Sequence, residues 1–199
     1  MSFLVKKRIY DAPPVSKKEI MRYLGCGEHS TELSALVSDC LSEAEDKLAY
    51  KVAFCYLPVH TDGERIDLCA FSFSSRDLCK SLAGSERVLL FGATVGIGID
   101  RLIARYSVVS PARAVVFQAI GAERIEALCD FFCREEEIKT GRALRPRFSP
   151  GYGDLPLSVQ RDVFNILDCQ RSIGLTLNES LIMSPSKSVT AFAAVGGTL

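Results

Sequence analysis

The sequence predicts an α+β fold in which helices pack against one mainly antiparallel sheet. Two observations indicate this class. Segments with the composition of strands are interspersed with segments that have the apolar period of helices, and no internal repeat or linker separates them. The length of 199 residues is also typical of one domain. We therefore expect residues 1–199 to form a single module.

The N-terminal part is predicted to contain a strand and two helices. The opening run at 3–10 has the composition of a strand. Ser16, followed three residues later by Glu19, is the pattern of a capping box, which predicts a short helix that ends near Gly25. Residues 31–48 place leucine, valine and cysteine side chains at i, i+3, i+4 and i+7, the stripe of an amphipathic helix.

The middle of the chain is predicted to consist mainly of strands joined by turns. TDGE at 61–64 has the composition of a turn. Three segments have the composition of strands, and two short helices, the first capped by Ser75, accompany them. The strands are expected at 51–59, 66–73 and 87–95, and the helices at 75–82 and 99–106.

The C-terminal part begins with a long helix. Ser110 and Pro111 fit the N-cap and N1 positions of a helix that runs to about Lys139. Another helix begins at Pro156. Two apolar runs, at 179–183 and 188–195, flank the sequence SPSK, which predicts a β-hairpin with its turn at Pro185.

Composition excludes several classes of protein. The 24 basic residues balance the 24 acidic ones, so the chain lacks the excess positive charge expected of a nucleic-acid-binding protein. At 48% hydrophobic residues it is too apolar for a disordered tail. It contains neither a signal-peptide core nor a run long enough for a membrane span, so we expect a cytoplasmic protein without a membrane partner.

The eight cysteines are interpreted as reduced thiols, mostly buried, because a cytoplasmic compartment keeps thiols reduced. A metal site is not expected. Cys129 and Cys133 are one helical turn apart, but only two histidines, His29 and His60, are available to complete a ligand set. Packing of the two cysteines on one face of a helix is the preferred interpretation.

A glycine motif follows the strand predicted at 87–95. Gly92, Gly96 and Gly98 have the spacing of a dinucleotide-binding loop, in which glycines let the backbone approach a pyrophosphate. However, no acidic residue follows at the required distance, and no tyrosine begins the Tyr-x3-Lys pair of a short-chain dehydrogenase. The main interpretation is a close packing turn between a helix and a strand; backbone that lines a ligand cleft is the alternative.

The segment at 143–156 has the most unusual composition of the chain. It places Arg145, Arg147, Tyr152 and Asp154 among three prolines and two glycines. Such a loop is rigid and lets backbone groups approach a ligand, so it suits a site for a charged small molecule. A stiff connector with surface arginines is an equal alternative.

Arg147-x3-Gly151-Tyr152 resembles the signature of the activation domain of cobalamin-dependent methionine synthase, which binds S-adenosylmethionine. The helix at 121–136, the helix at 156–168 and the segment IGLTLNESLIMSPSKSV are also similar to that domain. The resemblance is specific over about 110–195 and weak before it. It is strongest to free-standing, single-domain members of the family.

The resemblance implies a bent antiparallel sheet flanked by helices, with the Arg-Pro-Gly loop on its open side, and a site for S-adenosylmethionine. Arg147 would bind the carboxylate of this cofactor and Tyr152 would lie near the sulfonium or the sugar. Backbone of Ser149, Pro150 and Gly151 would bind the adenine or the aminoacyl group. Asp154 and Glu179 are candidates for the ammonium contact. No catalytic residue and no metal ligand is assigned.

The function implied is assistance in the reductive methylation, and so the reactivation, of cobalamin on a separate methionine synthase or corrinoid methyltransferase. Flavodoxin or another electron donor would be a further partner in this part of methionine biosynthesis. The chain has no corrinoid-ligating Asp-x-His-x2-Gly pattern, so cobalamin belongs to the partner, and the chain is not expected to be catalytic alone. Two alternatives stay open: a docking protein that no longer binds S-adenosylmethionine, and an independent small-molecule enzyme.

Overall fold

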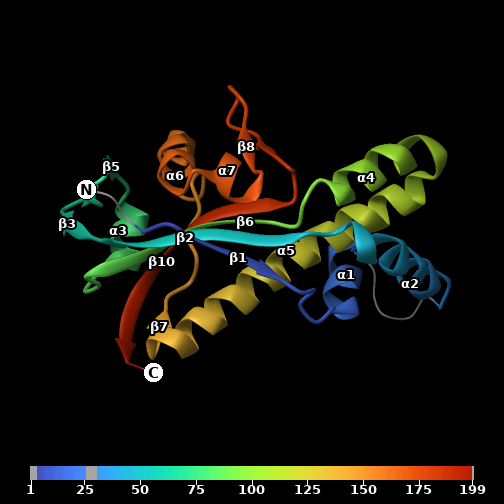
Figure 1. Ribbon diagram of the computed structural model, residues 1–199, viewed down its shortest axis with the longest axis horizontal. Coiled ribbons are helices and arrows are strands. Elements are labelled where there is room, and N and C mark those ends of the chain that lie inside the picture. The colour runs from blue at the N-terminus through green and yellow to red at the C-terminus, as the bar shows by residue number, and fades with distance from the viewer. Residues whose placement is uncertain (1–3, 26–30, 199) are drawn as a thin grey trace.

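A bent five-stranded sheet forms the centre of the protein, which a computed structural model describes over residues 4–25 and 31–198 (Figure 1). The strand order is β1-β2-β6-β10-β7, and every neighbouring pair is antiparallel. The predicted α+β class is therefore confirmed. The strands are β1 (Lys6–Tyr10), β2 (Tyr50–Pro58), β6 (Arg87–Thr94), β7 (Arg142–Leu144) and β10 (Ser188–Thr198).

Helices cover both faces of this sheet (Figure 1). On one face lie α1 (Lys17–Tyr23), α2 (Thr31–Ala44), α4 (Gly98–Val109) and α5 (Pro111–Thr140), and on the other lie α3 (Arg76–Leu82), α6 (Gln160–Leu167) and α7 (Cys169–Ile173). Short 3-10 helices occur at Glu45–Lys47 and Leu157–Val159. Within the described ranges, no helix combines the length and the apolar character needed to cross a bilayer.

Two small sheets complete the second face. One consists of β3 (His60–Asp62), β4 (Arg65–Asp67) and β5 (Ser72–Ser74), and the other of β8 (Thr176–Leu177) and β9 (Met183–Ser184).

The central strands alternate their side chains between two hydrophobic cores, because successive residues of a strand point to opposite faces. Phe54 and Phe91 point to the α5 face, where their rings lie 5.0 and 5.1 Å from that of Phe132. Cys55 and Leu90, their neighbours in sequence, point to the α6 face. Each buried phenylalanine of this kind stabilises the fold by about 1.5–3 kcal/mol. Both faces of the sheet must consequently be covered.

The local predictions agree with most of these elements. Ser75 caps α3, since its side chain accepts a hydrogen bond from the amide of Leu78. Pro111 begins α5, which ends at Gly141 in a left-handed conformation. The helix predicted at 31–48 changes to a 3-10 turn after Ala44, and the strand predicted at 66–73 is divided into β4 and β5 by a turn containing Cys69.

The predicted hairpin around Pro185 is wrong. β9 pairs with β8, whereas β10 pairs with β6 and β7. The apolar run of β10 has both faces buried, with Phe192 on one side and Ala191 and Ala193 on the other. It therefore occupies an interior position of the large sheet, where two strands satisfy its backbone, and the short β9 cannot replace either of them.

A buried ion pair attaches the N-terminal segment to α5. The guanidinium of Arg124 is 1% exposed and donates to the carbonyls of Pro13 (2.6 Å) and Pro14 (2.8 Å) and to the carboxylate of Glu123 (2.6 Å). Glu123 also accepts a hydrogen bond from the amide of Ser16 at 2.9 Å. Each buried charge is thus hydrogen-bonded, as burial of a charge requires.

This contact replaces half of the predicted capping box. The side chain of Ser16 does accept from the amide of Glu19 (3.3 Å), as expected. The side chain of Glu19, however, binds Arg22, and it is Glu123 on α5 that accepts from the amide of Ser16. Glu123 on α5 therefore replaces Glu19 as the acceptor for the amide of Ser16.

The glycine motif allows close packing. A Cβ on Gly98 would lie 1.9 Å from the carbonyl oxygen of Lys47, and Gly96 has a φ of +82°, which favours glycine. Gly92 leaves room for the sulfur of Cys169, 3.3 Å from its would-be Cβ. These contacts agree with the interpretation of the motif as a packing turn.

Replacement of Glu123 by alanine is expected to lower the free energy of unfolding by about 3–5 kcal/mol, because Arg124 is left buried without its partner. Urea denaturation measures this change. The matched control is Glu19→Ala, which removes the exposed partner of Arg22 and should cost less than about 1 kcal/mol. Equal effects of the two substitutions would show that the buried pair has no special role.

Replacement of Gly98 by alanine is expected to cost about 1–3 kcal/mol or more, because the new methyl group must displace the backbone at Lys47. Gly197→Ala is the control, since a Cβ at that position has nothing within 4 Å. Thermal unfolding of both variants, followed by circular dichroism, gives the comparison. A Gly98→Ala protein as stable as the control would contradict the packing explanation.

Candidate functional site

The Arg147 loop, residues 145–155, continues along the edge of the large sheet after β7. The amide of Arg145 donates to the carbonyl of Ala194 (3.0 Å), and Phe148 and Phe192 exchange two backbone hydrogen bonds of 2.8 Å. Phe148 therefore continues the pairing of β7 along the same edge of β10. Its ring packs into the core on the α6 face, and Arg147, its neighbour, reaches across to α5 on the opposite face.

Arg147 lies between two carboxylates of α5. Its guanidinium contacts Glu126 at 2.7 Å and Asp130 at 2.6 Å, and its side chain is 23% exposed. Burial by itself lowers the pKa of Arg147, but the acidic groups around it outweigh that effect and raise the pKa. The guanidinium is a permanent cation that has two anionic partners one helical turn apart.

Residues 149–155 form a compact turn that presents Tyr152 to solvent. The amide of Tyr152 donates to Ser149 (3.1 Å) and that of Gly151 to Leu155 (3.0 Å). Gly151 has a φ of +88°, which a side chain would strain. Pro150 is buried, whereas Tyr152 is 69% exposed, and its ring meets that of Phe148 edge-on at 5.3 Å. The exposed ring is therefore held in place and accessible.

Asp154, a candidate for the ammonium contact, is hydrogen-bonded to the beginning of α3. Its carboxylate accepts hydrogen bonds from the hydroxyl of Ser75 (2.6 Å) and from the amides of Arg76 (2.8 Å) and Asp77 (3.2 Å), the first residues of α3. The hydrogen bond from Ser75 is the main reason that its pKa is lowered. Asp154 anchors the loop to α3.

The carboxylates that do lie beside Arg147 were not identified from the sequence. Glu126 and Asp130 are 21 and 17 residues before Arg147 and belong to the predicted long helix. Their i, i+4 spacing on one helix face was visible, but only the fold shows that this face meets the loop. The predicted residues Arg147 and Ser149–Tyr152 are contiguous in space, with Arg147 facing α5 and Tyr152 facing solvent.

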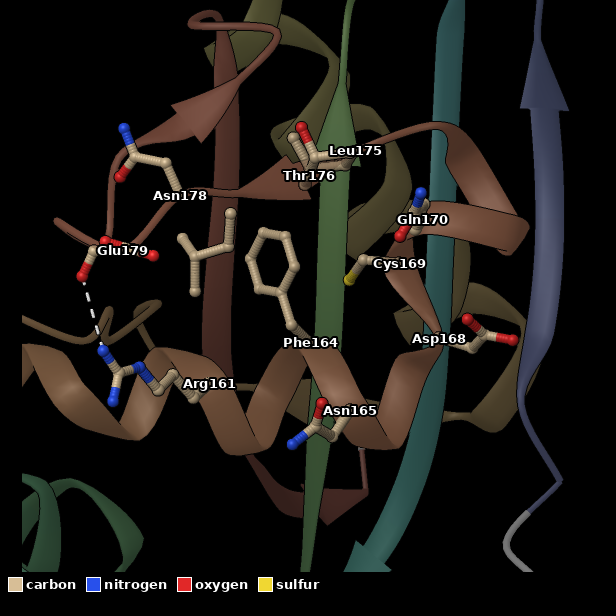
Figure 2. Close-up of a pocket in the computed structure, with 11 residues that line it drawn as sticks. Arg161, Phe164, Asn165, Asp168, Cys169, Gln170, Leu175, Thr176, Asn178 and Glu179 are labelled. Carbon is tan, nitrogen blue, oxygen red and sulfur yellow. Dashed lines mark hydrogen bonds between the residues drawn. The ribbon is translucent and has the colours of Figure 1, made fainter.

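A second feature, the α6–β8 cavity, has a volume of about 590 Å³ and lies between α6, α7 and β8. Figure 2 shows the ring of Phe164 pointing into it and Arg161 donating to the carbonyl of Glu179, at 3.3 Å. Asn165, Asp168 and Gln170 add polar groups to its wall. Glu179, a candidate for the ammonium contact, lines this cavity, whose lining includes no residue of the Arg147 loop.

The fold is shared with a solved structure of a reactivation domain. A solved structure of the MetH reactivation domain bound to AdoHcy matches with a TM-score of 0.70, covering 98% of this chain and 79% of that chain at 15% identity. At this identity the likeness shows a common fold: the bent antiparallel sheet flanked by helices that the sequence predicted.

The family follows from the sequence profile. The profile of the family described as vitamin B12 dependent methionine synthase, activation domain, matches residues 71–196, more than half of the chain. The chain belongs to this family, and the resemblance noted in its C-terminal part is confirmed and extended toward the N-terminus. Among curated proteins, no relative matches.

The thiol of Cys133 lies near Arg147, and burial raises its pKa to about 11. The neutral thiol is thus favoured, and we expect alkylation of Cys133 by iodoacetamide to be slow at pH 8 and to accelerate as the pH rises toward 11. Exposed Cys69 serves as the internal control in peptide mapping by mass spectrometry. Labelling of Cys133 as fast as Cys69 at pH 8 would contradict this expectation.

Proposed function

We propose that this protein binds S-adenosylmethionine at the Arg147 loop and assists the reductive methylation of cobalamin on a separate methionine synthase or related corrinoid methyltransferase. The observation that carries the proposal is the position of Arg147 between Glu126 and Asp130, in the same loop that presents the exposed Tyr152 to solvent. Membership of the activation-domain family and the AdoHcy bound to the MetH reactivation domain support it.

The site suits a zwitterion. The aminoacyl end of S-adenosylmethionine carries a carboxylate and an ammonium close together. The ligand carboxylate can replace one of the two carboxylates on Arg147 as a bidentate partner, and the released carboxylate of Glu126 or Asp130 can then accept the ammonium. The exchange turns two ion pairs into three, so binding leaves neither Arg147 nor the released carboxylate without a partner.

The exposed turn suits the other end of the ligand. Tyr152 offers a π face, which attracts a sulfonium as it attracts other cations. The backbone of Ser149–Gly151 is held rigid by the turn and can bind the sugar or the adenine. Methyl transfer from a sulfonium moves no proton. The chain would therefore contribute binding and orientation, while the partner would hold the cobalamin and flavodoxin or another donor would supply the electron.

In this role the chain would be one module of a cytoplasmic methionine-biosynthesis system that is not catalytic alone. The same position of Arg147 also favours a second candidate, a docking protein without cofactor binding. Both terminal nitrogens of the guanidinium are already bound by the protein's own carboxylates. The two candidates differ in one measurable property, the affinity for S-adenosylmethionine.

We expect Arg147→Ala to weaken S-adenosylmethionine binding at least tenfold in calorimetry, since a hydrogen bond to a charged group is worth about 1.5–3 kcal/mol. Arg147→Lys should retain part of the affinity, because it keeps the charge and loses the planar fork. The matched control is Arg171→Ala, which removes a positive charge whose side chain is 88% exposed on α7.

No binding by the wild type would eliminate the cofactor-binding candidate. If such a protein still co-purified with a corrinoid methyltransferase, and Arg147→Ala did not change this, the docking candidate would be supported. Circular dichroism of each variant confirms that a loss of affinity is not a loss of fold.

A further inference from the structure

A cavity of about 550 Å³ lies between the beginning of α4 and the segment that connects the 3-10 turn at Glu45–Lys47 to β2. We call it the α4 cavity. Its walls include four basic side chains and the glycine motif: Lys47, Lys51, Arg101, Arg105, Gly96 and Gly98. We propose that the α4 cavity is a binding site for a small molecule that carries a pyrophosphate or several phosphate groups.

The charge of the lining is the first argument. The four cations are accompanied by no carboxylate among the residues that line the cavity. Lys47 forms an exposed ion pair with Asp46 at 2.8 Å, and Arg105 lies over the ring of Tyr106 at 5.4 Å. For Lys51 and Arg101, the described residues supply no ion pair of 4 Å or less. In a chain of zero net charge, this is a local concentration of positive charge.

Two acidic side chains of neighbouring segments are hydrogen-bonded mainly by residues outside the lining. Glu43 is bound by Arg113 at 2.6 Å and by the hydroxyl of Tyr106 at 2.9 Å. Asp100, on α4 itself, accepts a hydrogen bond from the amide of Ser186 at 3.2 Å. Lys47 and Arg105 thus have the acidic neighbours Asp46 and Glu43, whereas Lys51 and Arg101 form no ion pair among the described residues, and a multiply charged anion would relieve the remaining repulsion.

The shape of the site is the second argument. Its volume lies within the range of about 300–1,000 Å³ that is usual for small-molecule sites. Ile97 and Leu102 supply apolar wall beside the cations, which leaves room for the organic part of a phosphate ester. Gly96 and Gly98 also line the cavity.

The beginning of α4 contributes a partial positive charge of the same sign as the side chains. The two arginines can each bind a phosphate through two parallel hydrogen bonds, and the lysines add mobile point charges. Two glycines of the motif, Gly96 and Gly98, therefore allow close packing on Lys47 and Ala49 and also line the cavity, which agrees with the alternative that the sequence left open.

Calorimetric titration with pyrophosphate tests the proposal on the full chain. We expect saturable binding by the wild type, at least tenfold weaker binding by the double variant Lys51→Ala, Arg101→Ala, and a change of less than twofold in Arg171→Ala. The last variant also removes a positive charge, one in place of two, but lies outside the lining of the α4 cavity. Circular dichroism checks that the double variant is folded.

Three results would overturn the proposal: no saturable binding of pyrophosphate by the wild type, an equal loss in Arg171→Ala, or equal affinity for citrate. Equal affinity for citrate would show that the site does not select phosphate. The affinity for S-adenosylmethionine is measured on the same variants. This affinity should be unchanged in the double variant. The proposal for the α4 cavity and the proposal for the Arg147 loop are therefore tested independently.

Discussion

Burial of the large sheet on both faces is the constraint on which the rest of the structure depends. β2 and β6 alternate side chains between two separate cores, so neither face can be left to solvent. The long α5 covers one face, and α6, α7 and α3 cover the other (Figure 1). One edge of β10 pairs with β6, and its other edge pairs with the Arg147 loop through Phe148. The candidate site is therefore positioned by the same strand that completes both cores.

The electrostatics of the Arg147 loop follow from this arrangement. A residue beside Phe148 must point to the opposite face of the sheet, and on that face it meets the acidic side of α5. The guanidinium is held by its ion pairs in a partly buried position before any ligand arrives. A ligand would exchange with existing partners at such a site and would not have to order a mobile side chain, a cost that weakens many binding sites.

Three positions show how tertiary contacts change the use of a local motif. The capping serine Ser16 obtains one of its partners from α5, 107 residues away. Asp154 lies in the loop that suggested a ligand site, yet its carboxylate caps α3. Gly98 has the spacing of a nucleotide loop, and its lack of a side chain is required by the carbonyl of Lys47. In each case the residue type was informative, but its partner was not local.

The sequence by itself determined the α+β class, most of the helices, the cap at Ser75, the beginning of α5 at Pro111, and the family signature at Arg147–Tyr152. These features depend on interactions within a few residues or on a contiguous motif, so they can be predicted from the sequence. Only the tertiary structure decided which carboxylates face Arg147, that Arg124 is buried against two proline carbonyls, and that β10 pairs with β6 while β9 pairs with β8. These contacts join distant segments. Local propensity allows many strand pairings, and the packing of both sheet faces, which depends on the whole chain, selects one of them.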